Sequence, residues 1–157
     1  MIDKFLVDTN VLVYVYDRSE AEKQNLAEVV CDRLVLSGRG ILSTQIMSEF
    51  FNATTRRLAE PLPLDLAYRR LENYHRSWEV VNITPTIVLE AARGAIDHQL
   101  SFWDALIWAT AKLNQVPVIL SEDFRSGTSL EGVRFVNPFG RDFDLQTWLG
   151  DDREMSY

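Results

Sequence analysis

Four acidic side chains stand at positions where a group of carboxylates would support metal-assisted chemistry. Asp8 follows the apolar run "KFLV", and Asp123 follows the apolar run "VPVIL" within "SEDF". Glu49 and Asp104 lie among apolar neighbours in "SEFFN" and "SFWDALIWATA". Ionised carboxylates close to one another repel, so a cluster of them must share protons or hold cations. If the four acids meet, we expect a cation site.

The donor chemistry of such a site narrows the choice of cation and reaction. A site of oxygen ligands alone favours Mg²⁺ or Mn²⁺ over zinc or copper. Cys31 is the only cysteine, which excludes a disulfide within the chain and a zinc site built from cysteines. One or two hard cations can activate a water and neutralise charge on the leaving oxygen of a phosphate ester. Phosphate hydrolysis would then need no His, Ser or Lys nucleophile.

Each acid also has a purely structural interpretation. Asp8 suits the N-cap of the helix that follows it, and Asp104 suits a capping box with a serine three residues earlier. Glu49 could project from a helix edge into solvent, and Asp123 could be a turn residue. None of these interpretations explains why all four acids gather in one part of the predicted fold, and their joint placement therefore favours a functional site.

The segments that must position these acids alternate between strand-like and helical patterns. This alternation predicts one α/β domain over residues 1–157, with a central parallel sheet of four to five strands covered by helices and joined by right-handed crossovers. The strands are expected at residues 4–7, 40–43, 79–83, 116–120 and 133–137. The helices are expected at residues 10–16, 20–36, 44–58, 64–75, 86–99 and 102–113.

This topology predicts where the acids meet. In open parallel sheets, ligands bind beyond the carboxyl ends of the strands, near the point where the strand order reverses. Asp8 and Asp123 follow two such strand ends, while Glu49 and Asp104 lie on helices that follow or precede strands. A shift of one residue reverses the direction of a side chain in a strand, so either Glu122 or Asp123 could face the site.

Composition limits the remaining classes of function. With 157 residues, of which 46% are hydrophobic, the chain can bury the core of one domain. No run approaches the roughly 18 apolar residues of a membrane span, so we expect a soluble cytoplasmic protein without a membrane partner. The last residues, from about 150 to 157, have the composition of a loose polar tail. The net charge of −7 argues against nucleic-acid binding through a broad basic face.

The order and spacing of several short motifs resemble those of the PIN-domain ribonucleases. The segments "LVDTNVLVY", "SEFFN", "SFWDALIWATA" and "ILSEDF" followed by "GVRFVNPF" are most like the VapC-type toxins of prokaryotic toxin–antitoxin modules. The resemblance covers nearly the whole chain and implies a PIN-like three-layer α/β fold.

The resemblance also implies roles for individual residues. It implies metal ligands, and so catalytic residues, at Asp8, Glu49, Asp104 and Asp123, and its spacing favours Asp123 over Glu122. Three further residues match polar positions of the family, and we interpret them as side chains that orient the carboxylates or waters. These residues are Thr9, Asn10 and Ser121.

The function implied by the resemblance is that of an Mg²⁺- or Mn²⁺-dependent endoribonuclease, which hydrolyses RNA by a metal-activated water. Further implications are a toxin role in a type II toxin–antitoxin pair, a cognate antitoxin protein and a homodimer. Because bound cations would attract phosphate, only a local rim of basic residues is needed to guide the RNA to the site. Its candidates are Arg56, Arg57, Arg69, Arg70, His75, Arg76, Arg93, Lys112 and Arg125. The alternative is a non-catalytic PIN-like module that binds protein or RNA, and the presence of all four acids argues against it.

Overall fold

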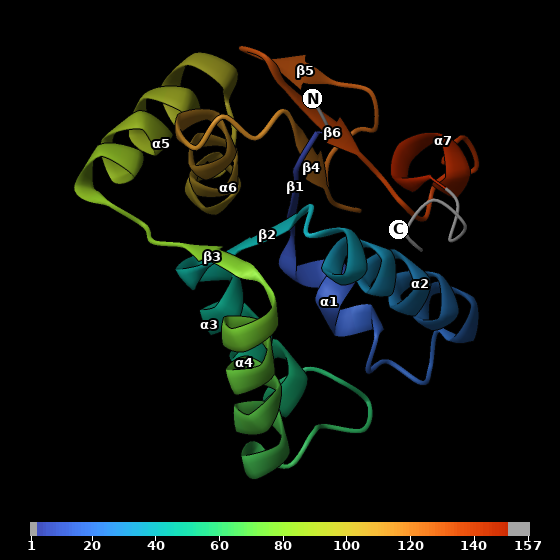
Figure 1. Ribbon diagram of the computed structural model, residues 1–157. Coiled ribbons are helices and arrows are strands. Elements are labelled where there is room, and N and C mark those ends of the chain that lie inside the picture. Colours follow the sequence, from blue (N-terminus) through green and yellow to red (C-terminus); the bar gives the residue numbers. More distant parts are fainter. Residues whose placement is uncertain (1–2, 151–157) are drawn as a thin grey trace.

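A twisted six-stranded sheet crosses the molecule, and helices flank it (Figure 1). The computed structural model describes residues 3–150. The strands are β1 (Phe5–Val7), β2 (Gly40–Ser43), β3 (Glu79–Val81), β4 (Val118–Leu120), β5 (Ser129–Leu130) and β6 (Val133–Val136). The helices are α1 (Thr9–Tyr14), α2 (Ala21–Ser37), α3 (Thr44–Arg56), α4 (Leu64–Ser77), α5 (Pro85–His98), α6 (Phe102–Leu113) and α7 (Leu145–Leu149). In Figure 1, α5 and α6 lie on one side of the sheet, and α2 and α7 on the other.

The strand order is β3-β2-β1-β4-β6-β5, and every pair except β5–β6 is parallel. The predicted parallel α/β sheet is therefore confirmed, while the predicted number of four to five strands is wrong. The strand that was missed, β5, has two residues and pairs with β6 across the tight turn Glu131–Gly132, whose φ angles are 49° and 86°. A strand of two residues is too short to produce an alternating pattern.

The central strand β1 is buried along its whole length. Phe5, Leu6 and Val7 are covered on both faces, as expected for a strand inside a parallel sheet with helices around it. Leu6 pairs with Ile41 of β2 on one side and with Ile119 of β4 on the other. The chain leaves β1 toward β2 and later returns to β4, so the strand order reverses at β1. The expected ligand crevice therefore lies at the carboxyl end of β1.

Several helices begin at side chains that accept hydrogen bonds from their first turns, although α2 and α4 do not. The hydroxyl oxygens of Ser43, Thr84 and Ser101 cap α3, α5 and α6 in this way. The observed bounds of the predicted helices and strands lie within about two residues of the predicted ones. Helix α7 was not predicted, because its five residues are fewer than two helical turns and show no clear apolar period.

Helices α5 and α6 pack closely because Gly94 faces Trp108. A Cβ atom at position 94 would lie 2.3 Å from the Trp108 ring, so no larger residue fits without a shift. Trp108 is fully buried, and its Nε1 donates a hydrogen bond to the Leu130 carbonyl at 3.1 Å. The two helices and the β5–β6 hairpin therefore meet at one tryptophan.

Two expectations concern the membrane and the chain end. Within residues 3–150, no helix combines the length and the apolar character needed to cross a membrane. The predicted polar tail falls on residues 151–157, outside the described residues, except for Gly150.

Candidate active site

The carboxyl ends of β1 and β4 bring the first two acids together. The Asp8 backbone N–H donates to the Leu120 carbonyl at 2.9 Å, which continues the ladder between the two strands. Asp8 is also the N-cap of α1, since its Oδ1 accepts a hydrogen bond from the Thr9 backbone at 2.7 Å. Asp123 follows β4 after two residues and is exposed. The capping interpretation of Asp8 is thus right, and it does not remove the side chain from the crevice.

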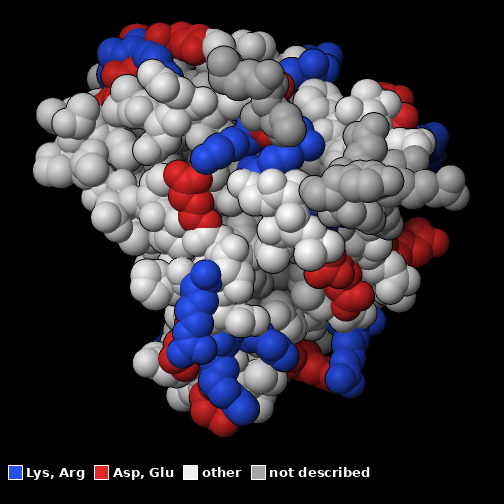
Figure 2. Space-filling view, in the orientation of Figure 1, with Lys and Arg blue, Asp and Glu red and all other residues white. Residues whose placement is uncertain are grey.

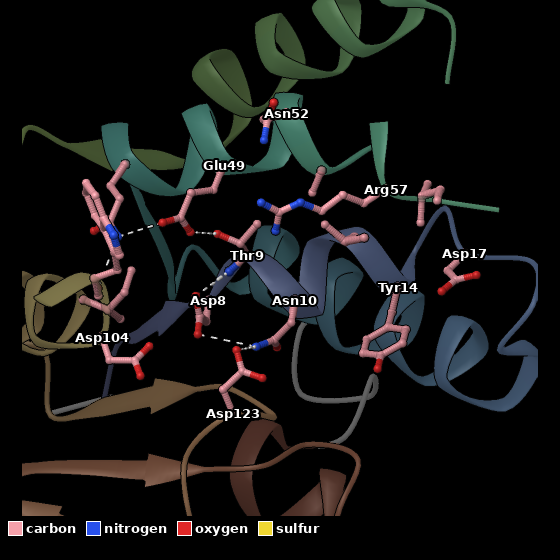
Figure 3. Close-up of a pocket in the computed structure, with 16 residues that line it drawn as sticks. Asp8, Thr9, Asn10, Tyr14, Asp17, Glu49, Asn52, Arg57, Asp104 and Asp123 are labelled. Atoms are coloured by element: carbon pink, nitrogen blue, oxygen red, sulfur yellow. Dashed lines mark hydrogen bonds between the residues drawn. The ribbon is translucent and has the colours of Figure 1, made fainter. Parts of the chain in front are cut away.

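Two helices supply the other acids. Glu49 lies in the second turn of α3, and Asp104 lies in the first turn of α6, where its backbone N–H donates to Ser101 Oγ at 3.2 Å. All four predicted acids line one cavity of about 660 Å³ at the end of the sheet (Figure 3). The four acids predicted from the sequence therefore share one cavity, although a fifth acid that was not predicted, Asp17, also lines it. The catalytic and metal-binding roles of the four acids stay predictions.

Asn10 and Ser121 connect the two strand-end acids. Ser121 Oγ donates to Asp8 Oδ2 at 2.7 Å and accepts from the Asp123 backbone N–H at 3.1 Å. The Asn10 amide lies between the carboxylates, with Nδ2 3.1 Å from Asp123 Oδ2 and 3.4 Å from Asp8 Oδ2. Both residues contact the acids, as the interpretation of them as orienting side chains requires.

Glu49 is held at both of its oxygens. Thr9 Oγ1 donates to Glu49 Oε2 at 2.7 Å, and Gln45 Nε2 donates to Glu49 Oε1 at 2.9 Å. The sequence reasoning missed Gln45, although its place four residues before Glu49 on one helix was a usable signal. Gln45 is buried, and its Oε1 has no hydrogen-bond partner among the described residues.

The environment of two of the acids, Asp8 and Asp104, opposes their ionisation. The pKa of Asp8 is raised to about 6, chiefly by burial and to a smaller extent by the nearby charges of Glu49 and Asp123, against the hydrogen bonds from Ser121 and Thr9. Burial also raises the pKa of Asp104, with smaller contributions from Asp123 and Glu49. No Lys, Arg or His of the described chain forms an ion pair with any of the four acids. A bound cation would offset this repulsion.

The donor set fits a hard divalent cation, because four carboxylates share a cavity in which only neutral groups donate to them. Within residues 3–150, however, no three His, Cys, Asp or Glu side chains stand close enough to hold an ion together. The Asn10 amide instead bridges Asp8 and Asp123. A cation would therefore have to replace hydrogen bonds of Asn10 as the group that links these carboxylates.

The structure distinguishes the two acids of "SED". Glu122 accepts a hydrogen bond from the Tyr14 hydroxyl at 2.7 Å and forms an ion pair with Lys23 at 2.9 Å. Asp123 lines the cavity, whereas Glu122 does not. Of the two alternatives left open by the sequence, Asp123 is the one that reaches the site, while Glu122 anchors the loop to α1 and α2.

Four of the nine residues of the predicted basic rim form ion pairs elsewhere. Arg93 and Lys112 form ion pairs with acids of α5 and the β5–β6 turn, and Arg69 and Arg76 pair with acids of α4. Figure 2 shows several Lys and Arg side chains over the part of the molecule where α4 lies, interleaved with acids. Of the predicted rim residues, Arg57 alone lines the cavity.

Comparison with known proteins agrees with this architecture. Residues 5–126 match the family model described as PIN domain. No curated protein matches the chain in sequence.

Solved structures of similar fold include toxins and toxin complexes. VapC20 of Mycobacterium tuberculosis, described as a Sarcin-Ricin loop cleaving toxin, has 17% identity and a TM-score of 0.60, covering 76% of this chain and 90% of its own. A DNA-bound VapBC from Salmonella typhimurium has 18% identity and a TM-score of 0.62, with coverages of 87% and 99%. A toxin–antitoxin complex from Klebsiella pneumoniae has 18% identity and a TM-score of 0.60, with coverages of 87% and 98%. At these identities the likeness bears on the fold.

Proposed function

The chain belongs to the PIN domain family, and from this premise we propose that it is a metal-dependent endoribonuclease that hydrolyses RNA phosphodiester bonds. One observation carries the proposal. Four carboxylates without a cationic partner among the described residues line one cavity at the point where the strand order reverses. Such a cavity repels a phosphate unless cations are bound, and with cations it suits phosphate chemistry.

We propose Mg²⁺ or Mn²⁺ as the cation, held by Asp8, Glu49, Asp104 and Asp123. When bound, such a cation lowers the pKa of a coordinated water and neutralises charge on the leaving oxygen. The family membership and the oxygen-only donor set both support this assignment.

The other polar residues of the cavity would keep the carboxylates in place. Ser121 fixes one oxygen of Asp8, and Thr9 and Gln45 fix the two oxygens of Glu49. Side chains that orient ligands in this way reduce the rearrangement needed when the substrate arrives. Asp8 is itself anchored by its N-cap bond to α1, so the cavity and the first helix form one rigid unit.

The proposed biological role is that of a VapC-type toxin, located in the cytoplasm and restrained by a cognate antitoxin. Two structures of similar fold are toxin–antitoxin complexes, which supports a protein partner here. We also propose a homodimer. The exposed apolar side chains of Leu89 and Ile96 on α5, beside Trp103 on α6, suit contact with a second copy of the chain.

A cleavage assay tests the proposed nuclease. Purified protein, freed from any bound partner, is incubated with structured RNAs in Mg²⁺ or Mn²⁺, with and without EDTA. We expect discrete cuts that disappear in EDTA and in Asp104→Asn, and that persist in Asp65→Asn. Asp65 is the matched control, because it is an exposed acid in the first turn of α4, outside the cavity. Cleavage that persists in EDTA, or equal activity of the two variants, would contradict the proposal.

A non-catalytic binding module is the second candidate. The observation in its favour is the Asn10 amide, which links Asp8 and Asp123 without a cation. Calorimetric titration with Mn²⁺ separates the two candidates. The nuclease requires Mn²⁺ binding that Asp104→Asn weakens, whereas a binding module requires none.

A further inference from the structure

We propose that Arg57 forms a second phosphate-binding subsite in the cavity, which holds an RNA phosphodiester group neighbouring the one at the four acids. The subsite rests on the proposed function, because it assigns a binding role to the part of the cavity away from the carboxylates. Three observations support it: the position of Arg57, the lack of a partner for its charge among the described residues, and its difference from the arginines that pair with acids.

Helix α3 directs one row of side chains into the cavity. Gln45, Glu49, Asn52 and Ala53 line it at intervals of three and four residues, and Arg57, the C-cap of the helix, follows four residues after Ala53. The Arg57 backbone N–H donates to the Ala53 carbonyl at 2.8 Å, which anchors the base of the side chain. In the view of Figure 3, the guanidinium extends along the cavity toward Thr9.

Arg57 is the only Lys or Arg among the 16 residues that line the cavity. Five of the other lining residues are acids, namely Asp8, Asp17, Glu49, Asp104 and Asp123. Even so, no ion pair or hydrogen bond joins the Arg57 guanidinium to another residue of the described chain. A guanidinium carries five N–H donors in a planar fork that matches two oxygens of a phosphate. Arg57 therefore keeps these donors for a ligand.

Other arginines of the chain behave differently. Arg93 contacts three carboxylates, and Arg69 and Arg76 each pair with an acid one helical turn away. These contacts hold the side chains on the surface of their own helices. Arg57 instead lines a concave site that is rich in acids, and none of its guanidinium donors is used by a residue of the described chain.

The cavity can hold more than one phosphate group. Its volume of about 660 Å³ falls within the usual range of roughly 300–1,000 Å³ for small-ligand sites. Asn52 and Tyr14 line it on the same side as Arg57, and in Figure 3 the acids Asp8, Asp104 and Asp123 lie on the other side, while the acid Asp17 lies beside Tyr14. A strand with one phosphate at the acids would therefore extend its next phosphate toward Arg57.

Binding of RNA without metal tests the subsite independently of catalysis. A fluorescein-labelled single-stranded RNA of about 12 nucleotides is titrated in EDTA with Asp8→Asn protein, in which one repelling charge is absent. In this background, Arg57→Gln is compared with Arg56→Gln by fluorescence anisotropy. Arg56 is the matched control, because it is an exposed arginine one residue earlier on α3 that does not line the cavity.

We expect Arg57→Gln to raise the Kd about tenfold and to reduce the salt dependence of binding by about 0.7 in the slope of log K against log salt, the contribution of one phosphate contact on a single strand. Arg56→Gln should remain within about twofold of the parent, and Arg57→Lys should recover part of the loss as a point charge. Thermal unfolding of each variant verifies that it is folded. Equal losses in Arg57→Gln and Arg56→Gln, no loss in either, or no RNA binding by the parent would overturn the subsite.

The subsite and the nuclease fail in different ways. If the wild-type protein cleaves RNA and Arg57→Gln leaves both the Kd and the KM unchanged, the subsite is wrong and the nuclease stands. If RNA binding depends on Arg57 while no RNA is cut in Mg²⁺ or Mn²⁺, the nuclease is wrong and the subsite stands.

Discussion

Two charged regions of the molecule are built in opposite ways. In the cavity, four carboxylates gather without a cationic partner among the described residues, and burial raises the pKa of Asp8 to about 6. In the second region, which we call the Glu131 cluster, Arg93, His98 and Lys112 surround Glu131 and contact its carboxylate at 2.7–3.3 Å. Hydrogen bonds from His98 and Arg93 lower the pKa of Glu131 to about 2.

This difference separates charges that pair with each other within the fold from charges that are available to bind a ligand. The Glu131 cluster surrounds Trp108, with Arg93 and Lys112 over its ring at 5.6 and 5.3 Å, and it holds Glu131 at a φ of 49°, in the left-handed region. Its charges are satisfied within the chain and fasten α5 and α6 to the β5–β6 turn. The carboxylates of the cavity accept hydrogen bonds from neutral donors only, and no cation of the described chain pairs with them.

Asp8→Asn should have the largest effect and should show that the charge of the cavity lowers stability, unlike the charges of the Glu131 cluster. We expect it to lower RNA cleavage by about a thousandfold, because one of the four proposed metal ligands is lost. The same change should raise the Tm by about 3 °C, because a buried carboxylate of raised pKa is removed and Asn retains the N-cap of α1. Cleavage kinetics and calorimetric unfolding of the metal-free protein measure the two effects. A lower Tm would show that the charge of Asp8 stabilises the fold.

Gly94→Ala would test the packing beneath the Glu131 cluster. We expect a loss of about 2 kcal/mol in the free energy of unfolding, because the added Cβ would lie 2.3 Å from the Trp108 ring in a filled core. Urea denaturation measures the loss. Ala92→Gly, at an exposed position of the same helix, is the control for backbone effects alone, and it should cost about 1 kcal/mol. Unchanged stability of Gly94→Ala would mean that the tryptophan can move aside.

Gln45→Ala would show whether the cavity depends on its supporting side chains. We expect cleavage to fall about tenfold, because Glu49 loses one of the two donors that fix its oxygens. The fold should lose little stability, since the removed side chain also carries a buried oxygen without a partner among the described residues. The affinity for Mn²⁺, measured by titration, should fall in parallel with the cleavage rate. Full activity would exclude a role for this contact.

Glu131→Gln should give the smallest effect and one confined to acid pH. A carboxylate with a lowered pKa stabilises the fold above its unfolded pKa of about 4.5, and this stability is lost as the pH falls toward about 2. The wild-type Tm should therefore fall more steeply than that of the variant between pH 4.5 and 2. Cleavage at neutral pH should not change. Parallel Tm curves would mean that solvent screens the cluster.

The sequence was sufficient for features that follow from repeated local patterns. Helices α3, α5 and α6 have apolar faces and begin at Ser or Thr caps that can be read from the sequence, so their bounds were predicted closely. Asp8 and Asp123 were predicted as neighbours because topology alone brings the ends of β1 and β4 together.

Features that depend on contacts across the fold were not predictable in this way. The sequence did not distinguish Arg57 from the other arginines of the predicted rim. Only the folded structure shows that Arg57 lines the cavity, whereas others, such as Arg93, form ion pairs. The two alternatives at Glu122 and Asp123 were decided by Lys23 and Tyr14, which lie about a hundred residues away in sequence. The short elements β5 and α7 have two and five residues, which is too few for a hydrophobic period to show in the sequence.

The double use of Asp8 has an evolutionary consequence. One side chain closes the first turn of α1 and also faces the cavity. Asparagine can replace it as a cap, and a single base change converts an aspartate codon into an asparagine codon. A single base change can therefore remove the proposed activity of the protein while its fold is kept. Selection acting on the surface of such a protein would continue after its chemistry had been lost.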